Sequence, residues 1–307
     1  MEFSIKKIKT MPSWSEIFNN FNKRQENERI SYLVKEKKQY LDEISRCTGR
    51  NVITYYSGWM QKPTAADVSI NDKDMNAFMD AVYKLDKSKG VDLILHTPGG
   101  DIAATEKIID YLHSIFKGDI RAIVPQMAMS AGSMIAVSCK EIMMGKQSCL
   151  GPFDPQIGGV ACQSVLKEFE KAKEDIKQNP HALGLWQVMF AKYNPTFLVT
   201  CEQAIELSDD LADEILSKTF SDKTKRKEIL KAFNNNNTTK VHSRHISKEK
   251  CKSVGLNIID MENDQHLQDM ILSLHHCYMI YLEQTIVTKI VENNIGGCTM
   301  RLLNVKH

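Results

Sequence analysis

Two short stretches of the sequence carry residues suited to attack on a carbonyl group. In "AMSAG" (128–132), Ser130 follows an apolar strand at the point where a helix is expected to begin. In "TPGGD" (97–101), Gly99 and Gly100 follow another apolar strand. A helix start presents free backbone N–H groups, and glycine lets the backbone approach a bound atom closely. Together the stretches supply a hydroxyl and two amide donors, which acyl transfer through a tetrahedral intermediate requires.

Each stretch alone also fits an ordinary structural role. Serine is a favoured helix N-cap, and small residues let a helix pack closely against a sheet. A Gly-Gly pair after a strand can serve only as a tight turn. The chemical interpretation depends on the combination, because the two stretches lie about 30 residues apart on successive strand–helix units.

The chain around these stretches alternates short apolar runs with helical patterns. The runs "NVITYY", "VDLILH", "IRAIVP" and "EIMMG" predict strands, and residues 72–86, 101–117 and 130–139 predict the helices between them. Such alternation is typical of βα units and of a largely parallel sheet covered on both faces. The sequence therefore predicts an α/β fold that brings the serine and the glycines to one edge of the sheet.

Helical segments flank this region on both sides. Residues 13–46 place apolar side chains at helical spacing among charges, which predicts a helical extension. Residues 264–292 predict a long helix, and the preceding "HSRHISKEKCKSVGLNIID" predicts a turn, a short helix ended by Gly255, and a strand. We therefore expect an N-terminal helical extension, a core and a C-terminal helical extension, at 1–49, 50–262 and 263–307.

The composition excludes several classes of protein. Forty basic and 38 acidic residues leave a net charge of +2, with no basic cluster interleaved with aromatic residues, so nucleic acid is not an expected partner. The apolar runs are shorter than the roughly 20 residues of a membrane span. The charged N-terminus does not resemble a secretory signal, so we expect a cytoplasmic protein. Eight cysteines without a CxxC pair predict neither a disulfide frame nor a zinc site.

Three stretches, "TPGGDIAATEKI", "AMSAGSMIA" and "GKQSCLGPFDPQIGG", resemble the Clp/crotonase superfamily. Within it they resemble serine peptidases of the Clp protease proteolytic subunit and signal peptide peptidase A type. With "NVITYYSGW" and "HSRHISKEKCKSVGLNIID", the chain is most similar to the serine dehydrogenase proteinase family, over about residues 50 to 300. The resemblance implies a fold of repeated ββα and βα units. It also implies Ser130 as nucleophile and the N–H groups of Gly100 and Ala131 as oxyanion hole, supported by Gly99.

The general base does not follow from the resemblance alone. "AMSAG" is not the GxSxG elbow of α/β-hydrolases, so the order of residues in that family does not apply. The Clp subunit carries a histidine on the segment that corresponds to "GPFDPQ", where this chain has Asp154 instead. We expect Asp154 to orient or shape the site, in a turn made rigid by Pro152 and Pro155.

Four residues are candidates for the base. Related membrane peptidases use a lysine from the following region, which corresponds to Lys167 or Lys171 and requires burial to lower the lysine pKa. Alignment of "KCKSVGLNI" with the matching C-terminal segment of the Clp subunit instead implies His242 or His245, because it brings this stretch near the position of that family's third triad residue. An imidazole also needs little adjustment of its pKa to act as a base. Lysine and histidine residues more often have a structural role than a catalytic one. Among the four candidates for the base, we rank His242 first and Lys171 second.

We therefore predict a soluble serine endopeptidase that cleaves peptide or protein substrates through Ser130, without metal or organic cofactor. The alternatives are a crotonase-like acyl-CoA enzyme, whose two N–H donors would hold a thioester enolate, and a catalytically silent oligomeric scaffold. A crotonase needs no hydroxyl at this helix start, which favours the peptidase. We also expect a homo-oligomer, because the terminal amphipathic segments have long apolar faces.

Overall fold

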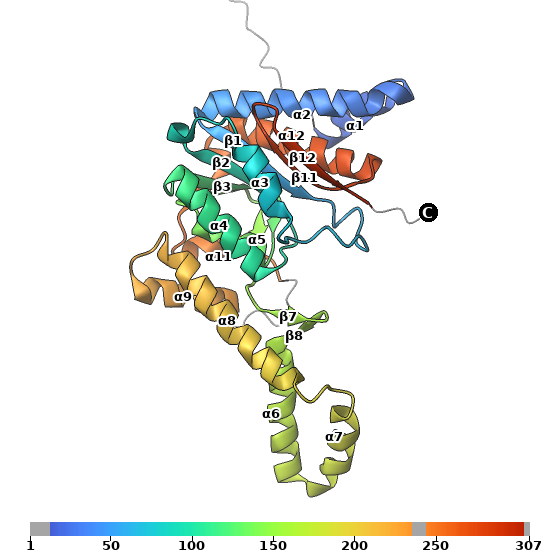
Figure 1. Ribbon diagram of the computed structural model, residues 1–307, viewed down its shortest axis with the longest axis vertical. Coiled ribbons are helices and arrows are strands. Elements are labelled where there is room, and N and C mark those ends of the chain that lie inside the picture. The colour runs from blue at the N-terminus through green and yellow to red at the C-terminus, as the bar shows by residue number, and fades with distance from the viewer. Residues whose placement is uncertain (1–12, 235–243, 304–307) are drawn as a thin grey trace, which may run out of the picture.

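A seven-stranded mixed sheet forms the centre of the computed structural model, which describes residues 13–234 and 244–303 (Figure 1). The strand order is β10-β5-β3-β2-β1-β11-β12. The five strands from β10 to β1 are parallel, and β11 and β12 complete the sheet in antiparallel pairing. Their bounds are β1 Asn51–Ser57, β2 Val91–His96, β3 Ile120–Val124, β5 Glu141–Met144, β10 Ile258–Asp260, β11 Val287–Asn293 and β12 Cys298–Leu302.

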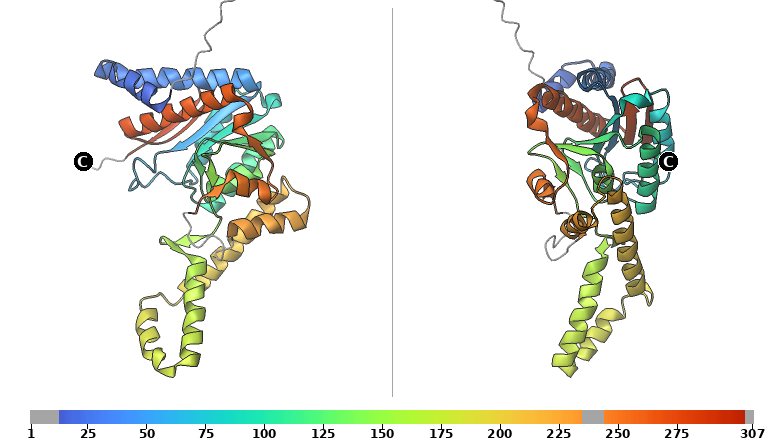
Figure 2. Two further views of the ribbon diagram at one scale, coloured as in Figure 1. Left: turned by 180° about the vertical axis from the view of Figure 1, so that it is seen from behind. Right: turned by 90° about the vertical axis from the view of Figure 1, so that its left-hand side faces the viewer.

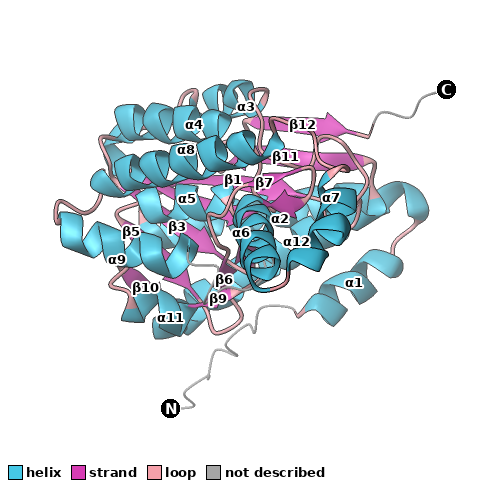
Figure 3. Ribbon diagram, turned by 90° about the horizontal axis from the view of Figure 1, so that it is seen from below, coloured by secondary structure: helices cyan, strands magenta, loops and turns pink. Residues whose placement is uncertain are grey.

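Helices cover both faces of this sheet, as the expected α/β fold requires (Figure 2). One face carries α3 Asp74–Val82, α4 Ile102–Phe116 and α5 Ala131–Ser138, with α8 Phe197–Ser217 and α9 Lys223–Asn234 beyond them. The other face carries α1 Trp14–Asn22, α2 Glu26–Thr48 and α12 Gln265–Gln284. Figure 3 shows the strands between these two layers. Successive strand residues point to opposite faces, so Tyr55 enters the first core and Tyr56 the second.

The helical structure expected for residues 13–46 is present as α1 and α2. A capping box formed by Ser13 and Glu16 begins α1, and Gly49 ends α2 in the left-handed conformation. Both helices bury their apolar sides in the core shared with α12, which includes Ile17, Leu33 and Leu41. These faces are therefore covered by the chain itself, and the reason given above for a homo-oligomer is wrong.

The helix expected at 264–292 is correct only as far as Gln284. Residues Val287–Asn293 instead form β11, which pairs with β1 along its length, and β12 follows. The β-branched residues of "IVTKIV" (286–291) favour a strand, but their helical neighbours hid the boundary. The last segment therefore contributes two strands to the central sheet and is not purely helical. The division at 49 and 262 stays a prediction.

A second, smaller sheet and a helical arm complete the structure. The small sheet has the order β4-β6-β9, with bounds β4 Met127–Ala128, β6 Cys149–Leu150 and β9 Ile246–Ser247. The hairpin of β7 Gln156–Ile157 and β8 Val160–Ala161 leads into the arm, which projects from the main body (Figure 1). The arm consists of α6 Cys162–Gln178, the short 3-10 helix η2 Pro180–Ala182, α7 Leu183–Phe190 and the first part of α8. The expected short helix and strand near Gly255 are confirmed as α11 Lys248–Ser253 and β10.

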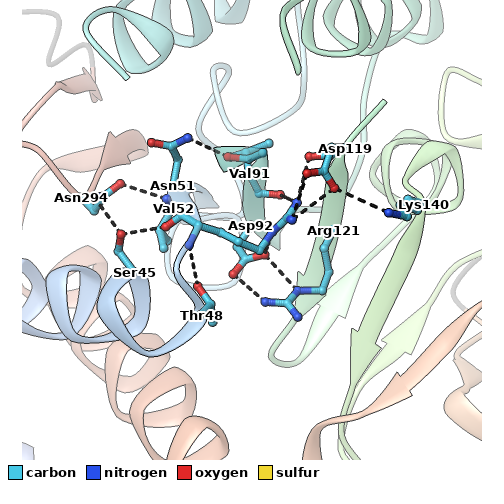
Figure 4. A network of polar contacts seen from close by, with 12 residues as sticks. Ser45, Thr48, Asn51, Val52, Val91, Asp92, Asp119, Arg121, Lys140 and Asn294 are labelled. Carbon is cyan, nitrogen blue, oxygen red and sulfur yellow. Dashed lines mark hydrogen bonds and ion pairs between the residues drawn. The ribbon is translucent and has the colours of Figure 1, made fainter. Parts of the chain in front are cut away.

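Charged side chains join the amino-terminal ends of β1, β2 and β3 (Figure 4). The Asp92 side chain is fully buried and accepts hydrogen bonds from Arg121 Nε (2.9 Å) and Nη2 (2.7 Å). Arg50 Nε donates to the same carboxylate at 2.9 Å, and its Nη1 donates to Asp119 at 3.1 Å. The carbonyl of Val91 accepts from Arg50 as well. This network, formed by Arg50, Asp92, Asp119 and Arg121, satisfies the buried carboxylate and ties three strands together.

None of the helices in the described parts of the chain combines the length and the apolar character needed to cross a bilayer.

Candidate functional site

Ser130 stands between the small sheet and α5 in an unusual backbone conformation. Its φ of 50° and ψ of −122° lie where residues with a side chain are rarely found. Such strain persists only where the surroundings enforce it, and it is concentrated at functional sites. Here Met129 N–H donates to the Thr97 carbonyl at 3.0 Å, and Gly132 N–H donates to the Met129 carbonyl at 2.8 Å. The strand end and the helix start thus hold Ser130 from both sides.

Small residues after Ser130 let α5 pack directly onto the end of β2. A Cβ atom on Gly132 would lie only 2.4 Å from Cγ2 of Thr97, so no larger residue fits without a shift. Ser133 is fully buried, its Oγ donates to the Ala128 carbonyl at 2.6 Å, and it accepts from Gly151 N–H at 2.7 Å. Ser133 therefore has a packing role, whereas the half-buried Ser130 side chain makes no cap hydrogen bond to its helix.

The glycine turn lies directly against the start of α5. A Cβ atom on Gly99, whose φ is 93°, would lie 2.8 Å from Cβ of Ser130 and 2.9 Å from the amide nitrogen of Ala131. At Gly100 a Cβ atom would lie 2.3 Å from both the nitrogen and the oxygen of Ile70. Both positions therefore require glycine. At Gly100 a side chain is excluded by the main chain of Ile70, a contact that the sequence did not indicate.

The two amides expected to form an oxyanion hole are unpaired within the described residues. Neither Gly100 N–H nor Ala131 N–H donates a hydrogen bond to any group there. Ala131 is the first residue of α5, where an N–H has no partner inside the helix and lies at the positive end of the dipole. Both residues line the same cavity as Ser130. The site therefore offers two amide donors beside a hydroxyl.

This cavity has a volume of about 510 Å³ and reaches from the glycine turn to the arm. Its walls come from five regions that are distant in sequence: the chain before α3, the glycine turn, the start of α5, the segment up to β8, and α8. Among the described lining residues none is a lysine, arginine or histidine. The lining residues are Ser69, Pro98, Gly99, Gly100, Asp101, Ile102, Ser130, Ala131, Met134, Phe153, Asp154, Pro155, Gln156, Gly159, Ala204, Leu207 and Ser208.

Asp154 lies in the wall of this cavity and is only 1% exposed. The preceding residue holds it in place, because the Phe153 N–H donates to the Phe233 carbonyl at 3.3 Å and the Phe153 carbonyl accepts from Ser208 Oγ at 2.9 Å. The Phe153 ring also stacks on Phe233 at 4.5 Å between centroids. Asp154 is thus fixed in the cavity wall, and its expected role of orienting or shaping the site stays a prediction.

The structure does not bring the described candidates for the base into the cavity wall. Lys167 and Lys171 are exposed on α6, and Lys171 lies about 13 Å along the helix axis from Cys162. His245 is exposed just before β9 and lines a different depression, with Lys231 and Lys250. His242 lies outside the described residues. The identity of the base stays a prediction.

Sequence reasoning missed the residues that enclose the cavity from afar. The main chain of Ile70 pairs with Gly100, Ser69 lines the cavity, and Ala204, Leu207 and Ser208 of α8 line it as well. Small and apolar residues of this kind carry no motif, and the pairing of Ile70 with Gly100 is a tertiary contact. Within the described residues, no group of three or more histidine, cysteine or carboxylate side chains could hold a metal ion.

A strained serine at a helix start, beside two amides without partners among the described residues, is an arrangement that can support nucleophilic attack on a carbonyl. A model of the family described as ClpP-like SDH-type serine proteinase matches residues 24–279. The chain belongs to this family.

Two curated proteins of Methanocaldococcus jannaschii are similar to the chain. The uncharacterized protein MJ1495 is 27% identical over 234 residues, which is 75% of this chain and 73% of that protein. The uncharacterized protein MJ0137 is 30% identical over 189 residues, which is 62% of this chain and 60% of that protein. The similarity therefore extends over most of the fold.

Proposed function

We propose that the protein is a serine endopeptidase whose nucleophile is Ser130. One observation carries the proposal: Ser130 is held at a positive φ in a cavity that is also lined by Gly100 and Ala131, whose N–H groups have no partner among the described residues. In this mechanism Ser130 Oγ attacks the peptide carbonyl, and the developing oxyanion accepts hydrogen bonds from the two amides. The family match supports this reaction. We also propose that the core has the repeated ββα units of the Clp/crotonase fold.

We assign the general base to His242, with Asp154 as the orienting carboxylate. The direction of β9 supports this assignment, because Ile246 pairs with Leu150 and Leu150 with Ala128. Since β9 runs antiparallel to β6, the chain reaches it from the edge at which β4 leads into Ser130. Lys171 has less support because it is exposed on α6, none of whose residues lines the cavity. The proposed reaction uses only groups of the chain, and no observation favours an acyl-CoA substrate.

We further propose self-association through the arm, in a cytoplasmic protein. The apolar faces of α1, α2 and α12 are buried in their common core. In α7, by contrast, Leu183, Leu185 and Val188 are 46%, 64% and 65% exposed. Clustered apolar side chains of this kind are typical of contact surfaces. Light scattering at micromolar concentration should give a mass above the 34.9 kDa of one chain, and a fully active monomer would contradict this proposal.

A serine-reactive fluorophosphonate tests the nucleophile. We expect one adduct per chain, and tandem mass spectrometry should place it on Ser130 rather than Ser133, together with loss of hydrolysis of a fluorogenic peptide. Ser130→Ala should remain unlabelled, whereas Ser133→Ala serves as the matched control because its hydroxyl already has two hydrogen-bond partners. Labelling of folded Ser130→Ala at the wild-type rate would refute the assignment.

The pH profile of peptide hydrolysis distinguishes the bases. A histidine should give a rise in kcat/KM with an apparent pKa near 6.5, whereas a lysine should place the rise above neutrality. His242→Ala should remove most of the activity, and Lys171→Ala, Lys167→Ala and His245→Ala should retain it. Full activity in His242→Ala would show that the base lies elsewhere.

A further inference from the structure

A buried ion pair lies behind the glycine turn, outside the cavity. Lys289 of β11 and Asp74 of α3 have side chains that are 2% and 1% exposed, and Lys289 Nζ lies 2.9 Å from the Asp74 carboxylate. Tyr55 O–H also donates to this carboxylate, at 2.8 Å. A buried ion pair is expensive to desolvate and is weak evidence for stability alone, so its other contacts matter.

Those contacts go to the residues on either side of Ile70. Lys289 Nζ donates to the Ser69 carbonyl at 2.7 Å. The Asp74 carboxylate accepts from Asn71 N–H at 3.1 Å. The ion pair therefore fixes the main chain immediately before and immediately after Ile70.

Ile70 in turn fixes the main chain on either side of Gly100. Its N–H donates to the Gly99 carbonyl at 2.8 Å, and its carbonyl accepts from Asp101 N–H at 2.9 Å. These two hydrogen bonds set the plane of the peptides around Gly100, and Gly100 N–H itself has no partner in the part of the chain that the structure describes. The contacts thus form a continuous path from Lys289 to Gly100, which lines the cavity.

We infer that Lys289 and Asp74 are positioning residues for the reaction, which through Ser69, Ile70 and Asn71 hold Gly100 N–H in the orientation that binds the oxyanion. This inference rests on the proposed function. An amide that is misaligned by a small rotation keeps its place in the fold but loses hydrogen-bond strength in the transition state. The pair should therefore affect kcat more than substrate binding.

The chain offers a matched control on the same strand. Lys37 and Glu292 form a second buried pair at 2.8 Å, with side chains 3% and 11% exposed. Glu292 lies three residues after Lys289 on β11 and therefore on the opposite face of the sheet. Lys37 contacts the rings of Tyr278 and Tyr281 and no residue of the glycine turn.

The experiment compares Lys289→Met with Lys37→Met. Asp74→Asn and Glu292→Gln form the second pair, in case a lysine variant does not fold. Fluorophosphonate titration counts the active sites, so that kcat is expressed per reactive serine. We expect kcat per site to fall about 10- to 100-fold in Lys289→Met and Asp74→Asn, below the loss for a deleted oxyanion donor, with KM within about twofold of wild type. The control variants should lower the unfolding temperature similarly and leave kcat per site unchanged.

Hydrogen exchange tests the same inference without activity. The amides of Ile70 and Asp101 should exchange faster in Lys289→Met and not in Lys37→Met. Unchanged kcat per site and unchanged exchange in both variants of the first pair would overturn the inference, as would equal losses in the control pair. Absence of Ser130 labelling in the wild type would instead refute the proposed function, and the exchange result would still decide whether the ion pair fixes the turn.

Discussion

The two ends of the parallel strands are built in opposite ways. At the amino-terminal ends, the network of Arg50, Asp92, Asp119 and Arg121 satisfies a fully buried carboxylate with three donor groups. At the carboxyl-terminal ends, Ser130 has a strained backbone and two neighbouring amides have no partner in the described structure. β2 runs between them, with about 17 Å from Asp92 to Thr97.

This difference separates stability from chemistry along the same strands. Polar groups with all their hydrogen bonds made lower the free energy of the folded state. Unpaired donors and backbone strain raise it, but the unpaired donors remain available to bind a ligand. We therefore expect substitutions at the first end to change the free energy of unfolding, and those at the second end to change turnover.

The largest effect should come from Ser130→Ala. Removal of the nucleophile should lower kcat by about six orders of magnitude, by comparison with other serine proteases. The free energy of unfolding should change by less than about 0.5 kcal/mol, because the Ser130 hydroxyl makes no cap hydrogen bond. Peptide hydrolysis and urea denaturation measure the two quantities. A strongly destabilised variant would show that Ser130 contributes to stability, as the network at the amino-terminal ends of the strands does.

Asp92→Ala should have the converse effect. The substitution leaves Arg50 and Arg121 without the carboxylate between them and should lower the free energy of unfolding by about 3–5 kcal/mol. Because the network lies at the far end of β2, kcat per titrated active site should match the wild type. A fall in kcat per site without a loss of stability would break the distinction between the two ends.

Gly100→Ala should affect both quantities, since the new Cβ atom would meet the main chain of Ile70. The displaced turn moves one oxyanion donor, so kcat should fall about 100-fold. The unfolding free energy should fall by about 1–2 kcal/mol, through strain and the weakened pairing with Ile70. Kinetics per active site and denaturation test this, and wild-type turnover would contradict the role of Gly100 N–H.

The smallest effect concerns His96, the last residue of β2, whose ring lies 4.3 Å from Trp59 and 5.1 Å from His275. Burial lowers the pKa of His96 to about 3. Between pH 6.5 and 3 the unfolded chain therefore binds a proton that the folded chain excludes, so stability is full above pH 6.5 and declines as the pH falls. Burial also lowers the pKa of His275, which adds to this decline.

His96→Phe should reduce this acid sensitivity by up to about 1.4 kcal/mol per pH unit. Unfolding free energies at pH 7, 6 and 5 measure the slope. The matched control is the exposed His266→Phe, which should leave it unchanged. Equal slopes in wild type and His96→Phe would show that His96 does not stay neutral in the folded protein.

Much of the fold follows from local patterns in the sequence. The apolar runs that became β1, β2, β3 and β5 are buried on both faces, and continuous burial is what a parallel sheet requires. The serine and glycine stretches also share one cavity, because successive parallel strands end at the same edge.

What the sequence did not reveal depends on tertiary contacts. β11 lies among residues with mixed propensities, and its pairing with β1 decides its conformation. The role of Ile70 comes from its main chain, which any residue except proline could supply. No sequence motif marks Lys37 or Lys289 as buried, although both are buried against partners more than 200 residues away.

The contact between Gly132 and Thr97 also limits how these two positions can vary. Thr97 supplies a methyl group that fills the space above Gly132, while its Oγ1 accepts a hydrogen bond from Gly99 N–H at 3.1 Å. Thr97→Ser would keep the hydroxyl acceptor and remove the methyl group. Gly132→Ala would then fit, whereas before Thr97→Ser its Cβ atom would clash with that methyl group. An evolving lineage would therefore have to acquire the two substitutions in a fixed order, and each residue restricts the mutational history of the other.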